Sequence, residues 1–222
     1  MALAVFDLDH TLLSGDSDYL WGEFLIANGL VEAERYRAQN RDFMAAYNAG
    51  TLDIHAFCAF SFEPLVRWGR AHLEPLRQRF VEEEIAPRVA PGARPLLDRH
   101  RRAGDRLLIT TATNRFVTEP IAELLGVADL LATEPEERDG AFTGAIAGTP
   151  NFREGKPERL RQWLREHAAE GERLACYSDS RNDVPLLEMA DRPVAVDPDE
   201  ALAAHARSRG WPIISLADAG GD

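Results

Sequence analysis

Apolar and polar positions along the chain predict strands and helices in turn. The run Ala2–Leu8 is short, apolar and bounded by acidic residues, which is typical of a strand buried on both faces. Further strands are predicted at residues 106–111, 129–133, 173–178, 193–196 and 212–216, with a hairpin at 141–147. Helices are predicted at residues 94–102, 115–125 and 157–169. This alternation predicts an α/β fold, a doubly wound parallel sheet with helices on both faces.

The segment from about residue 14 to residue 90 has helical periodicity instead. A first apolar stripe at positions 20, 21, 24 and 25 predicts a helix that Ser17 or Asp18 caps and that ends near Gly29. Later stripes predict a second helix that ends at Gly50, a third that Thr51 caps, and a further helix around positions 73–80. We interpret this segment as a compact helical insert.

The turn formed by Pro91 and Gly92 marks the return to the alternating pattern. We therefore predict a core domain formed by residues 1–14 and 91–222. Residues 15–90 are predicted to form a small helical cap, inserted after the first strand.

The composition indicates a globular protein, because 45% of the 222 residues are hydrophobic and 28% are charged. The 25 Lys and Arg residues against 37 Asp and Glu residues give a formal net charge of −12. This charge argues against a nucleic-acid or membrane partner, since both need a cationic face. Cys58 and Cys176 lie far apart without a C-x-x-C spacing, which excludes a disulfide scaffold and a zinc knuckle.

The start of the chain has no basic leader region, and no apolar run approaches 18 residues. We therefore expect a soluble, cytoplasmic protein without a membrane span. As oligomeric state we expect a monomer or a homodimer.

Two aspartates come directly after the first apolar run. Asp7 and Asp9 are two positions apart, so in an extended chain their side chains lie on one side, about 6.6 Å apart. Carboxylates this close repel each other and lose hydration, which is costly unless a cation or hydrogen-bond donors compensate. The alternative is a turn in which one of the two aspartates caps the next segment.

A second acidic loop follows a later predicted strand. Asp179 and Asp183 lie four positions apart in it, with Ser180 and Asn182 between them. Asp183 could instead cap a helix at residues 184–190, which would leave Asp179 unexplained. A calcium EF-hand is excluded, because the loop lacks the central glycine and the closing glutamate.

A hydroxyl-rich turn and one lysine complete the set. The turn that contains Thr111, Ala112 and Asn114 precedes a helix, where hydroxyls and free backbone N–H groups can hold an anion. Ordinary helix capping explains the same residues. Lys156 is not part of a P-loop, because Pro150 takes the place of the first glycine. The alternative explanation is that Lys156 is a solvated charge on the surface.

Together, the four aspartates, the lysine and the hydroxyls fit phosphoryl transfer. Mg²⁺ commonly binds one or two carboxylates, water molecules and a phosphate oxygen. A carboxylate can act as a nucleophile and form an aspartyl-phosphate. A hydroxyl, a lysine and a metal ion can then neutralise the phosphoryl oxygens.

The order of these motifs resembles the haloacid dehalogenase-like superfamily, in particular its phosphoserine-phosphatase-like branch. The resemblance covers nearly the whole chain and implies the Rossmann-like core of that superfamily with a helical cap between the first two motifs. The matching positions, in the order of the four motifs, are Asp7-x-Asp9-x-Thr11, Thr111, Lys156 and Asp179-Ser180-x-x-Asp183.

The resemblance also implies roles for these residues. Asp7 would attack phosphorus, and Asp9 would protonate the leaving oxygen and then activate water. Mg²⁺ is implied at the Asp7 side chain, the Asp9 backbone carbonyl and the Asp179 side chain. Thr111 and Lys156 would hold the phosphate oxygens. The residues that would lie behind the metal ligands and orient them are Asp183, Ser180 and Asn182.

Substrate contacts are implied in the same way. Asp16 falls where phosphoserine phosphatases carry a glutamate that holds the substrate amine, although it could serve only as a helix N-cap. An acid there favours an aminated phosphate ester such as phosphoserine or histidinol phosphate. Ala112 and Asn114 are further expected contacts, whereas His10 departs from the serine of those phosphatases. Candidates for an arginine that binds a substrate carboxylate are Arg35, Arg37 and Arg41.

We therefore expect a Mg²⁺-dependent phosphomonoester hydrolase, whose partner is a small phosphorylated metabolite. One alternative is a phosphotransferase or a phosphonate-cleaving relative, and another is a non-catalytic sensor of a phosphate ligand on the same fold. The presence of both Asp7 and Asp9 argues against a sensor, because binding alone needs no acid-base pair. Asp9, Asp179 and Asp183 also argue against a dehalogenase, which needs neither a metal ion nor an acid for its leaving group.

Overall fold

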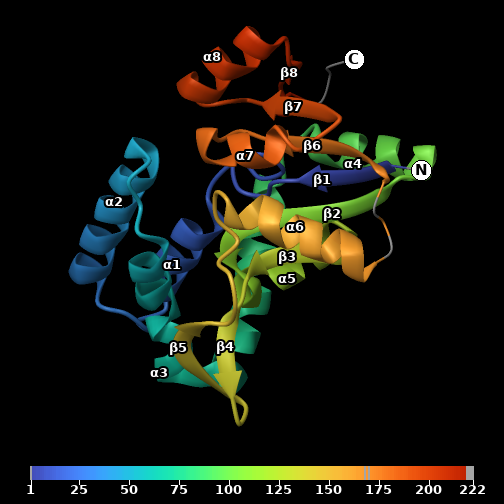
Figure 1. Ribbon diagram of the computed structural model, residues 1–222. Helices are drawn as coiled ribbons and strands as arrows, with labels where there is room; N and C mark the ends of the chain where they lie inside the picture. Colours follow the sequence, from blue (N-terminus) through green and yellow to red (C-terminus); the bar gives the residue numbers. More distant parts are fainter. Residues whose placement is uncertain (1, 168, 170, 219–222) are drawn as a thin grey trace.

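Six parallel strands form the central sheet of the computed structural model, which describes residues 2–167, 169 and 171–218 (Figure 1). In spatial order they are β3 (Asp129–Thr133), β2 (Arg106–Asn114), β1 (Ala2–Phe6), β6 (Arg173–Ser178), β7 (Arg192–Val196) and β8 (Ile213–Ile214). The order reverses between β1 and β6, which confirms the predicted doubly wound α/β fold. Ligands bind such sheets at the carboxyl ends of the strands where the order reverses.

Helices cover both faces of this sheet because its central strand is apolar on both sides. Leu3 and Val5 of β1 belong to one buried cluster, and Ala4 and Phe6 belong to another on the opposite face. The first cluster includes side chains from α6 (Gly155–Glu166), α7 (Val184–Leu187) and α8 (Glu200–Arg209). The second includes side chains from α4 (Ala93–Ala103) and α5 (Arg115–Leu124).

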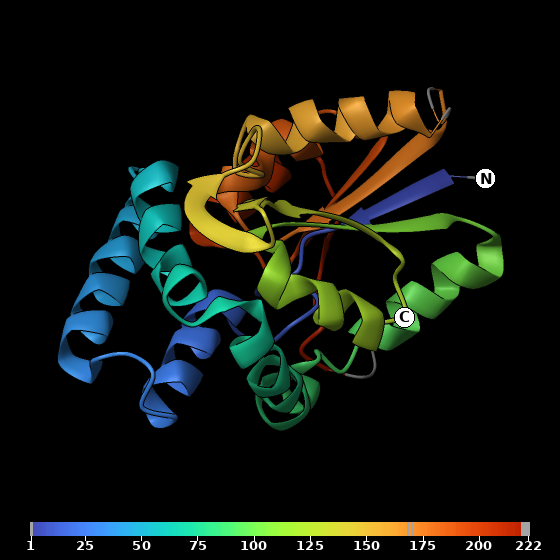
Figure 2. The same cartoon turned by 90° about the horizontal axis from the view of Figure 1, so that it is seen from below.

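The first three helices after β1 lie to one side of the sheet, next to the carboxyl ends of its central strands (Figures 1 and 2). They are α1 (Ser17–Ala27), α2 (Ala33–Ala49) and α3 (Ile54–Phe80), followed by a π-helical turn (Val81–Ile85) and a 3₁₀ turn (Ala86–Arg88). The two helices predicted after residue 51 are joined in α3, which is interrupted at Gly69, where φ is 71°. In the described part of the chain, none of the helices combines the length and apolar character needed to cross a membrane.

The caps of these helices differ from the predicted ones. Asp16 caps α1, instead of Ser17 or Asp18. Asp53 caps α3, instead of Thr51. In both places the carboxylate of an aspartate one or two positions from the predicted cap accepts hydrogen bonds from the free N–H groups of the first turn. Hydrophobic periodicity alone does not locate a cap to the exact residue.

The segments that enter and leave these helices lie side by side. Leu13 and Val89 form an antiparallel bridge, and the backbone N–H of Ser14 donates to the carbonyl oxygen of Arg88 at 2.7 Å. The predicted boundaries between core and cap fall beside this pair of segments. That the two parts behave as separate domains stays a prediction.

A hairpin from the core reaches the cap helices. The sequence predicted a hairpin within residues 141–147, but only one of its strands lies there. β5 (Ala141–Ile146) pairs with β4 (Pro135–Arg138) and packs against α3 (Figure 2). The Arg70 guanidinium of α3 lies 5.2 Å from the ring centroid of Phe142 and donates a hydrogen bond to Glu137. The cap is therefore supported by a segment that follows the second motif in sequence.

Asn151 ties the loop before α6 to the sheet. Its side chain is fully buried, and Nδ2 lies 2.9 Å from Thr110 Oγ1 and from the carbonyl oxygens of Thr111 and Leu131. Its backbone N–H donates to Thr133 Oγ1 at 3.0 Å. One amide thus joins β2, β3 and the loop that leads to Lys156.

Replacing this amide should destabilise the fold. We expect Asn151→Ala to lower the free energy of unfolding by about 2–3 kcal/mol, because buried carbonyl oxygens lose their donor. Urea unfolding followed by circular dichroism measures the change. The matched control is Asn48→Ala at an exposed position, expected to lie within about 0.5 kcal/mol of the unmodified protein. Equal stabilities of the two variants would contradict the role of Asn151.

Candidate active site

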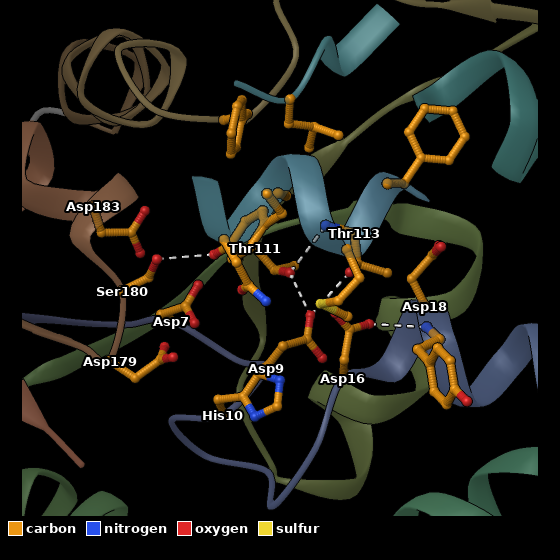
Figure 3. Close-up of a pocket in the computed structure, with 18 of the residues that line it drawn as sticks. Asp7, Asp9, His10, Asp16, Asp18, Thr111, Thr113, Asp179, Ser180 and Asp183 are labelled. Atoms are coloured by element: carbon orange, nitrogen blue, oxygen red, sulfur yellow. Dashed lines mark hydrogen bonds between the residues drawn. The ribbon is translucent and has the colours of Figure 1, made fainter. Parts of the chain in front are cut away.

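A cavity of about 350 Å³ lies at the switch point of the sheet, between the carboxyl ends of β1 and β6 and the helices α1 and α2 (Figure 3). Its wall brings together residues as far apart in the chain as Asp7 and Asp199. The residues from the four motifs that line it are Asp7, Asp9, Thr111, Lys156, Asp179, Ser180 and Asp183. The chemical groups expected from the sequence therefore surround one space.

Lys156 bridges two carboxylates in this cavity. Its Nζ donates to Oδ1 of Asp7 at 2.7 Å and to Oδ2 of Asp183 at 2.6 Å, and all three side chains are buried. Gly155 allows the tight turn before it, because a Cβ at this position would lie 2.1 Å from the carbonyl oxygen of Pro150. Lys156 is thus an internal ion-pair partner, and the alternative of a solvated surface charge is wrong.

This one lysine does not balance the acids around it. Burial raises the pKa of Asp7 to about 7; Lys156 opposes the rise, and Asp183 and Asp9 add to it. Burial also raises the pKa of Asp179 well above its ordinary value, with further contributions from Asp7 and Asp183. Burial by itself lowers the pKa of Lys156, but the attraction of Asp183 and Asp7 raises it above its ordinary value. The site therefore holds excess negative charge.

The loop after β6 uses both of its aspartates inside the site. Asp183 accepts a hydrogen bond from Ser178 Oγ at 2.7 Å in addition to that from Lys156. The alternative that Asp183 caps the next helix is wrong, because its carboxylate accepts no hydrogen bond from the first turn of α7. Asp179 accepts a hydrogen bond from Thr11 Oγ1 at 3.0 Å, which links the fourth motif to the first.

Asp7 and Asp179 are the carboxylates that could hold a divalent cation. Repulsion from Asp7 contributes to the raised pKa of Asp179, and a cation between them would relieve it. Across residues 2–167, 169 and 171–218, no three His, Cys, Asp or Glu side chains are arranged to enclose a metal ion. Two carboxylates beside an open cavity fit Mg²⁺, which completes its coordination with water and phosphate oxygens.

Asp9 is half-buried and held by three donors. The backbone N–H of Ser17 donates to Oδ1 at 2.7 Å, and the hydroxyls of Thr113 and Thr111 donate to Oδ2 at 2.9 and 3.3 Å. The start of α1 and the end of β2 thus fix its orientation. Asp9 therefore accepts the first N–H of α1, as the capping alternative supposed, although Asp16 is the N-cap residue of that helix.

Asp16 and Ala112 line the cavity, as expected for substrate contacts. Asp16 also accepts a hydrogen bond from the backbone N–H of Tyr19 at 2.9 Å, so it combines the two alternatives, a cap and a position on the cavity wall. Burial, followed by repulsion from Asp9, raises the pKa of Asp16 to about 6. Asp16 is therefore a helix cap on the cavity wall, and its contact with a substrate amine stays a prediction.

Asn114 and Asn182 do not line the cavity, although both were expected to belong to the site. Asn114 caps α5, where its Oδ1 accepts from the N–H of Val117 at 3.1 Å. Asn182 accepts a hydrogen bond from Nε of Arg153 at 3.2 Å. Ser180, in contrast, lines the cavity and accepts a hydrogen bond from the Tyr47 hydroxyl at 3.0 Å.

The cavity wall also includes polar residues that were not assigned to the site from the sequence, among them Thr113, Asp18, Asn40 and Tyr47. Thr113 lay within the hydroxyl-rich turn, and Asp18 was explained as a helix cap. Asn40 and Tyr47 are seven positions apart on α2, which places them on one face of the helix. That spacing is the one signal that could have identified them.

The arginines considered for a substrate carboxylate lie elsewhere. Arg35 pairs with Glu63 at 2.6 Å and Arg37 with Glu23 at 2.7 Å, and Arg41 is exposed. Within the described ranges, no arginine lines the cavity. The expectation that one of these three binds substrate is therefore wrong.

Comparisons with known proteins agree with the motifs. The family model of haloacid dehalogenase-like hydrolases matches residues 4–188. A histidinol-phosphatase of Neisseria meningitidis is 42% identical over 221 residues, which are 96% of this chain and 98% of that protein. A phosphoserine phosphatase of Mycobacterium tuberculosis is 32% identical over 224 residues, which are 96% of this chain and 70% of that protein.

Solved structures agree as well. A Bordetella pertussis protein of unknown function superposes with a TM-score of 0.88 at 43% identity, covering 96% of this chain and 98% of that one. A substrate-bound phosphoserine phosphatase superposes with a TM-score of 0.67 at 19% identity, covering 97% of this chain and 92% of that one. At this identity the similarity shows the fold alone. The chain belongs to the haloacid dehalogenase-like hydrolase family.

Proposed function

We propose that the protein is a Mg²⁺-dependent phosphomonoester hydrolase that acts on a small aminated metabolite through an aspartyl-phosphate intermediate. The arrangement of Asp7 and Asp9 carries this proposal. Asp7 stands at the end of β1 with Lys156 on one carboxylate oxygen, and Asp9 is held beside the same cavity by hydroxyl and N–H donors. A nucleophile and an acid-base group thus share one space.

In the first step, an oxygen of Asp7 attacks phosphorus, and the bond between phosphorus and the ester oxygen breaks. The leaving alkoxide takes a proton from Asp9, which becomes a carboxylate. Lys156 and Thr111 stabilise the charge on the remaining phosphoryl oxygens. The donors on Asp9 keep its carboxyl group oriented toward the leaving oxygen.

In the second step, the Asp9 carboxylate takes a proton from a water molecule, whose oxygen attacks phosphorus. The bond between phosphorus and the Asp7 oxygen breaks, which returns the Asp7 carboxylate and releases inorganic phosphate. Asp9 is then protonated again. One residue serves as acid and base, because it lies next to the space that the alcohol leaves and that water enters.

We assign Mg²⁺ to the side chains of Asp7 and Asp179 and to the backbone carbonyl of Asp9. When bound, the ion withdraws charge from the phosphoryl oxygens and offsets repulsion between the carboxylates. Thr11 orients Asp179, while Lys156 and Ser178 hold Asp183 behind this pair. These hydrogen bonds preorganise the site before substrate binds.

A cavity of about 350 Å³ suits a small metabolite. The Neisseria relative is named for histidinol phosphate and the mycobacterial relative for phosphoserine. Both esters carry an amino group, and Asp16 on the cavity wall offers a carboxylate to such a group. The substrate class that we propose is therefore an aminated phosphate ester.

Asp7→Asn is expected to abolish turnover, because an amide cannot replace the carboxylate as nucleophile. With p-nitrophenyl phosphate and Mg²⁺ as the assay, we expect kcat to fall by at least about 1,000-fold. Asp42→Asn, at an exposed position of α2, is the matched control and should retain full activity. EDTA should stop the reaction and added Mg²⁺ should restore it. Normal turnover by Asp7→Asn would exclude the nucleophile assignment, and binding without hydrolysis by the unmodified protein would favour a sensor.

Asp9→Asn is expected to form the aspartyl-phosphate and to hydrolyse it slowly. p-Nitrophenolate leaves without help from an acid, whereas the attacking water still needs a base. Mass spectrometry after rapid mixing should detect the covalent phosphoryl group on this variant. An unphosphorylated Asp9→Asn protein with normal turnover would contradict the acid-base role.

The raised pKa of Asp7 predicts that the stability of the metal-free protein falls as the pH rises. In the unfolded chain this carboxyl ionises near pH 3.8, and in the folded chain near pH 7. Between these values the folded state holds the extra proton, so rising pH lowers the stability of the metal-free protein through this group. Asp7→Asn removes the effect. Its stability relative to the unmodified protein in EDTA should therefore increase by about 2–4 kcal/mol between pH 4 and pH 8.

Chemical unfolding at several pH values measures this difference. The Asp42→Asn control should show no such change with pH. A constant difference between Asp7→Asn and the unmodified protein over the same pH range would contradict the burial of an ionisable Asp7.

A further inference from the structure

The cap side of the cavity carries two carboxylates that the proposed reaction steps do not use. Asp16 and Asp18 line the cavity at the start of α1 (Figure 3). Within the part of the chain that the structure describes, neither forms an ion pair. The basic side chains on the cavity wall are Lys156, which two other carboxylates already bind, and the exposed His10. His10 opposes the rise in the pKa of Asp16 but does not cancel it, so this end of the cavity keeps excess negative charge.

The stabilisation of α1 does not explain why the Asp18 carboxylate is buried. A carboxylate in the first turn is favoured by the helix dipole, but that interaction does not require burial, and Asp18 is only 5% exposed. The hydrogen bond that it accepts from Asn114 Nδ2 is long, at 3.4 Å. Burial, together with Asp16 and Asp9, raises the pKa of Asp18 well above its ordinary value. A cation in the cavity would supply the missing compensation.

A second buried group on this wall has an unused hydrogen-bonding atom. Asn40 of α2 lines the cavity and is 5% exposed, and its Nδ2 has no partner among the described residues. It lies against Gly22, one helical turn after Asp18, where an added Cβ would be 3.0 Å from Nδ2. Buried donors are seldom left unpaired, and this one, enclosed against α1, becomes available to a ligand acceptor once the Asn40 side chain turns toward the cavity.

The rest of this wall is apolar and partly aromatic. Phe43 and Phe57 line it, with their ring centroids 5.5 Å apart and their planes at 77°. A flat or hydrocarbon body can pack against such side chains. A ligand carboxylate, in contrast, would face Asp16 and Asp18 with His10 as the one unengaged basic side chain, since no arginine lines the cavity within the described ranges and Lys156 is bound by Asp7 and Asp183.

We propose that Asp16, Asp18 and Asn40 form a subsite for the leaving alcohol, and that this alcohol carries an ammonium group and no carboxylate. Asp16 and Asp18 accept hydrogen bonds from the ammonium group. Asn40 donates to an acceptor such as the unprotonated nitrogen of an imidazole ring, and Phe43 and Phe57 pack against that ring. This assignment rests on the proposed phosphatase function and makes Asp18 a specificity-determining residue.

A panel of phosphate esters separates the amine from the carboxylate. O-Phosphoethanolamine has the amine of O-phosphoserine without its carboxylate, phosphoglycolate has a carboxylate without an amine, and histidinol phosphate combines an amine with an imidazole. We expect kcat/KM to be highest for histidinol phosphate and at least about tenfold higher for O-phosphoethanolamine than for O-phosphoserine. A higher kcat/KM for O-phosphoserine or phosphoglycolate than for O-phosphoethanolamine would overturn the proposal.

Asp18→Asn tests the subsite directly, since it removes the charge and keeps the size of the side chain. We expect the ratio of kcat/KM for histidinol phosphate to kcat/KM for p-nitrophenyl phosphate to fall by at least about 30-fold, because only the first ester loses a charge partner. Asp42→Asn is the control and should leave this ratio unchanged. An equal loss with both esters, or no loss, would overturn the proposal.

Asp16→Asn gives an independent test should Asp18→Asn fold poorly. Asparagine caps helices as well as aspartate does, so the start of α1 is kept while the charge is lost. The same ratio should fall. If the unmodified protein hydrolyses p-nitrophenyl phosphate but does not prefer aminated esters, the subsite is wrong and the phosphatase function stands. If it hydrolyses none of these esters, both are wrong.

Discussion

The ion pairs of Lys156 with Asp7 and Asp183 are the interaction on which the rest of the site depends. They join the ends of β1 and β6 to the start of α6, in a place where any one of these charges alone would be very costly to bury. One ammonium group nevertheless serves a larger number of carboxylates, and the raised pKa of Asp7 reflects that imbalance. The cation and the phosphoryl group that we propose for this site would relieve the same crowding.

The topology of the sheet decides where this crowding occurs. Chain connections leave β1 and β6 on opposite sides of the switch point, so a crevice opens at their carboxyl ends and the first and fourth motifs face each other across it. The cap closes this crevice through the hydrogen bond from Tyr47 to Ser180 and through Arg153, which donates to Asn182 and to the carbonyl oxygen of Gly50. The core thus supplies the reactive groups, and α1 and α2 supply most of the wall that a leaving alcohol would touch.

Local patterns in the sequence were sufficient for the architecture and for the reactive groups. Short apolar runs and helical periodicity predicted the six-stranded sheet and most of the helices, because these patterns reflect burial within a few neighbouring residues. Asp7, Asp9 and Lys156 each had an ordinary local explanation, and their combination, in an order that resembles the haloacid dehalogenase-like superfamily, is what indicated a site. Their convergence on one cavity could be expected, since the carboxyl ends of parallel strands meet at one edge of the sheet.

The sequence by itself determined the fold class and the residue types available for phosphoryl transfer; the tertiary structure decided which partner each one has. Asp183 had two local explanations, and only the position of Lys156, distant in the chain, distinguished them. Asp18 and Asn40 share a wall because α1 and α2 approach closely at Gly22, which no local pattern encodes. Helix and strand propensities act over a few residues, whereas burial, charge compensation and hydrogen-bond partners are set by how whole elements pack.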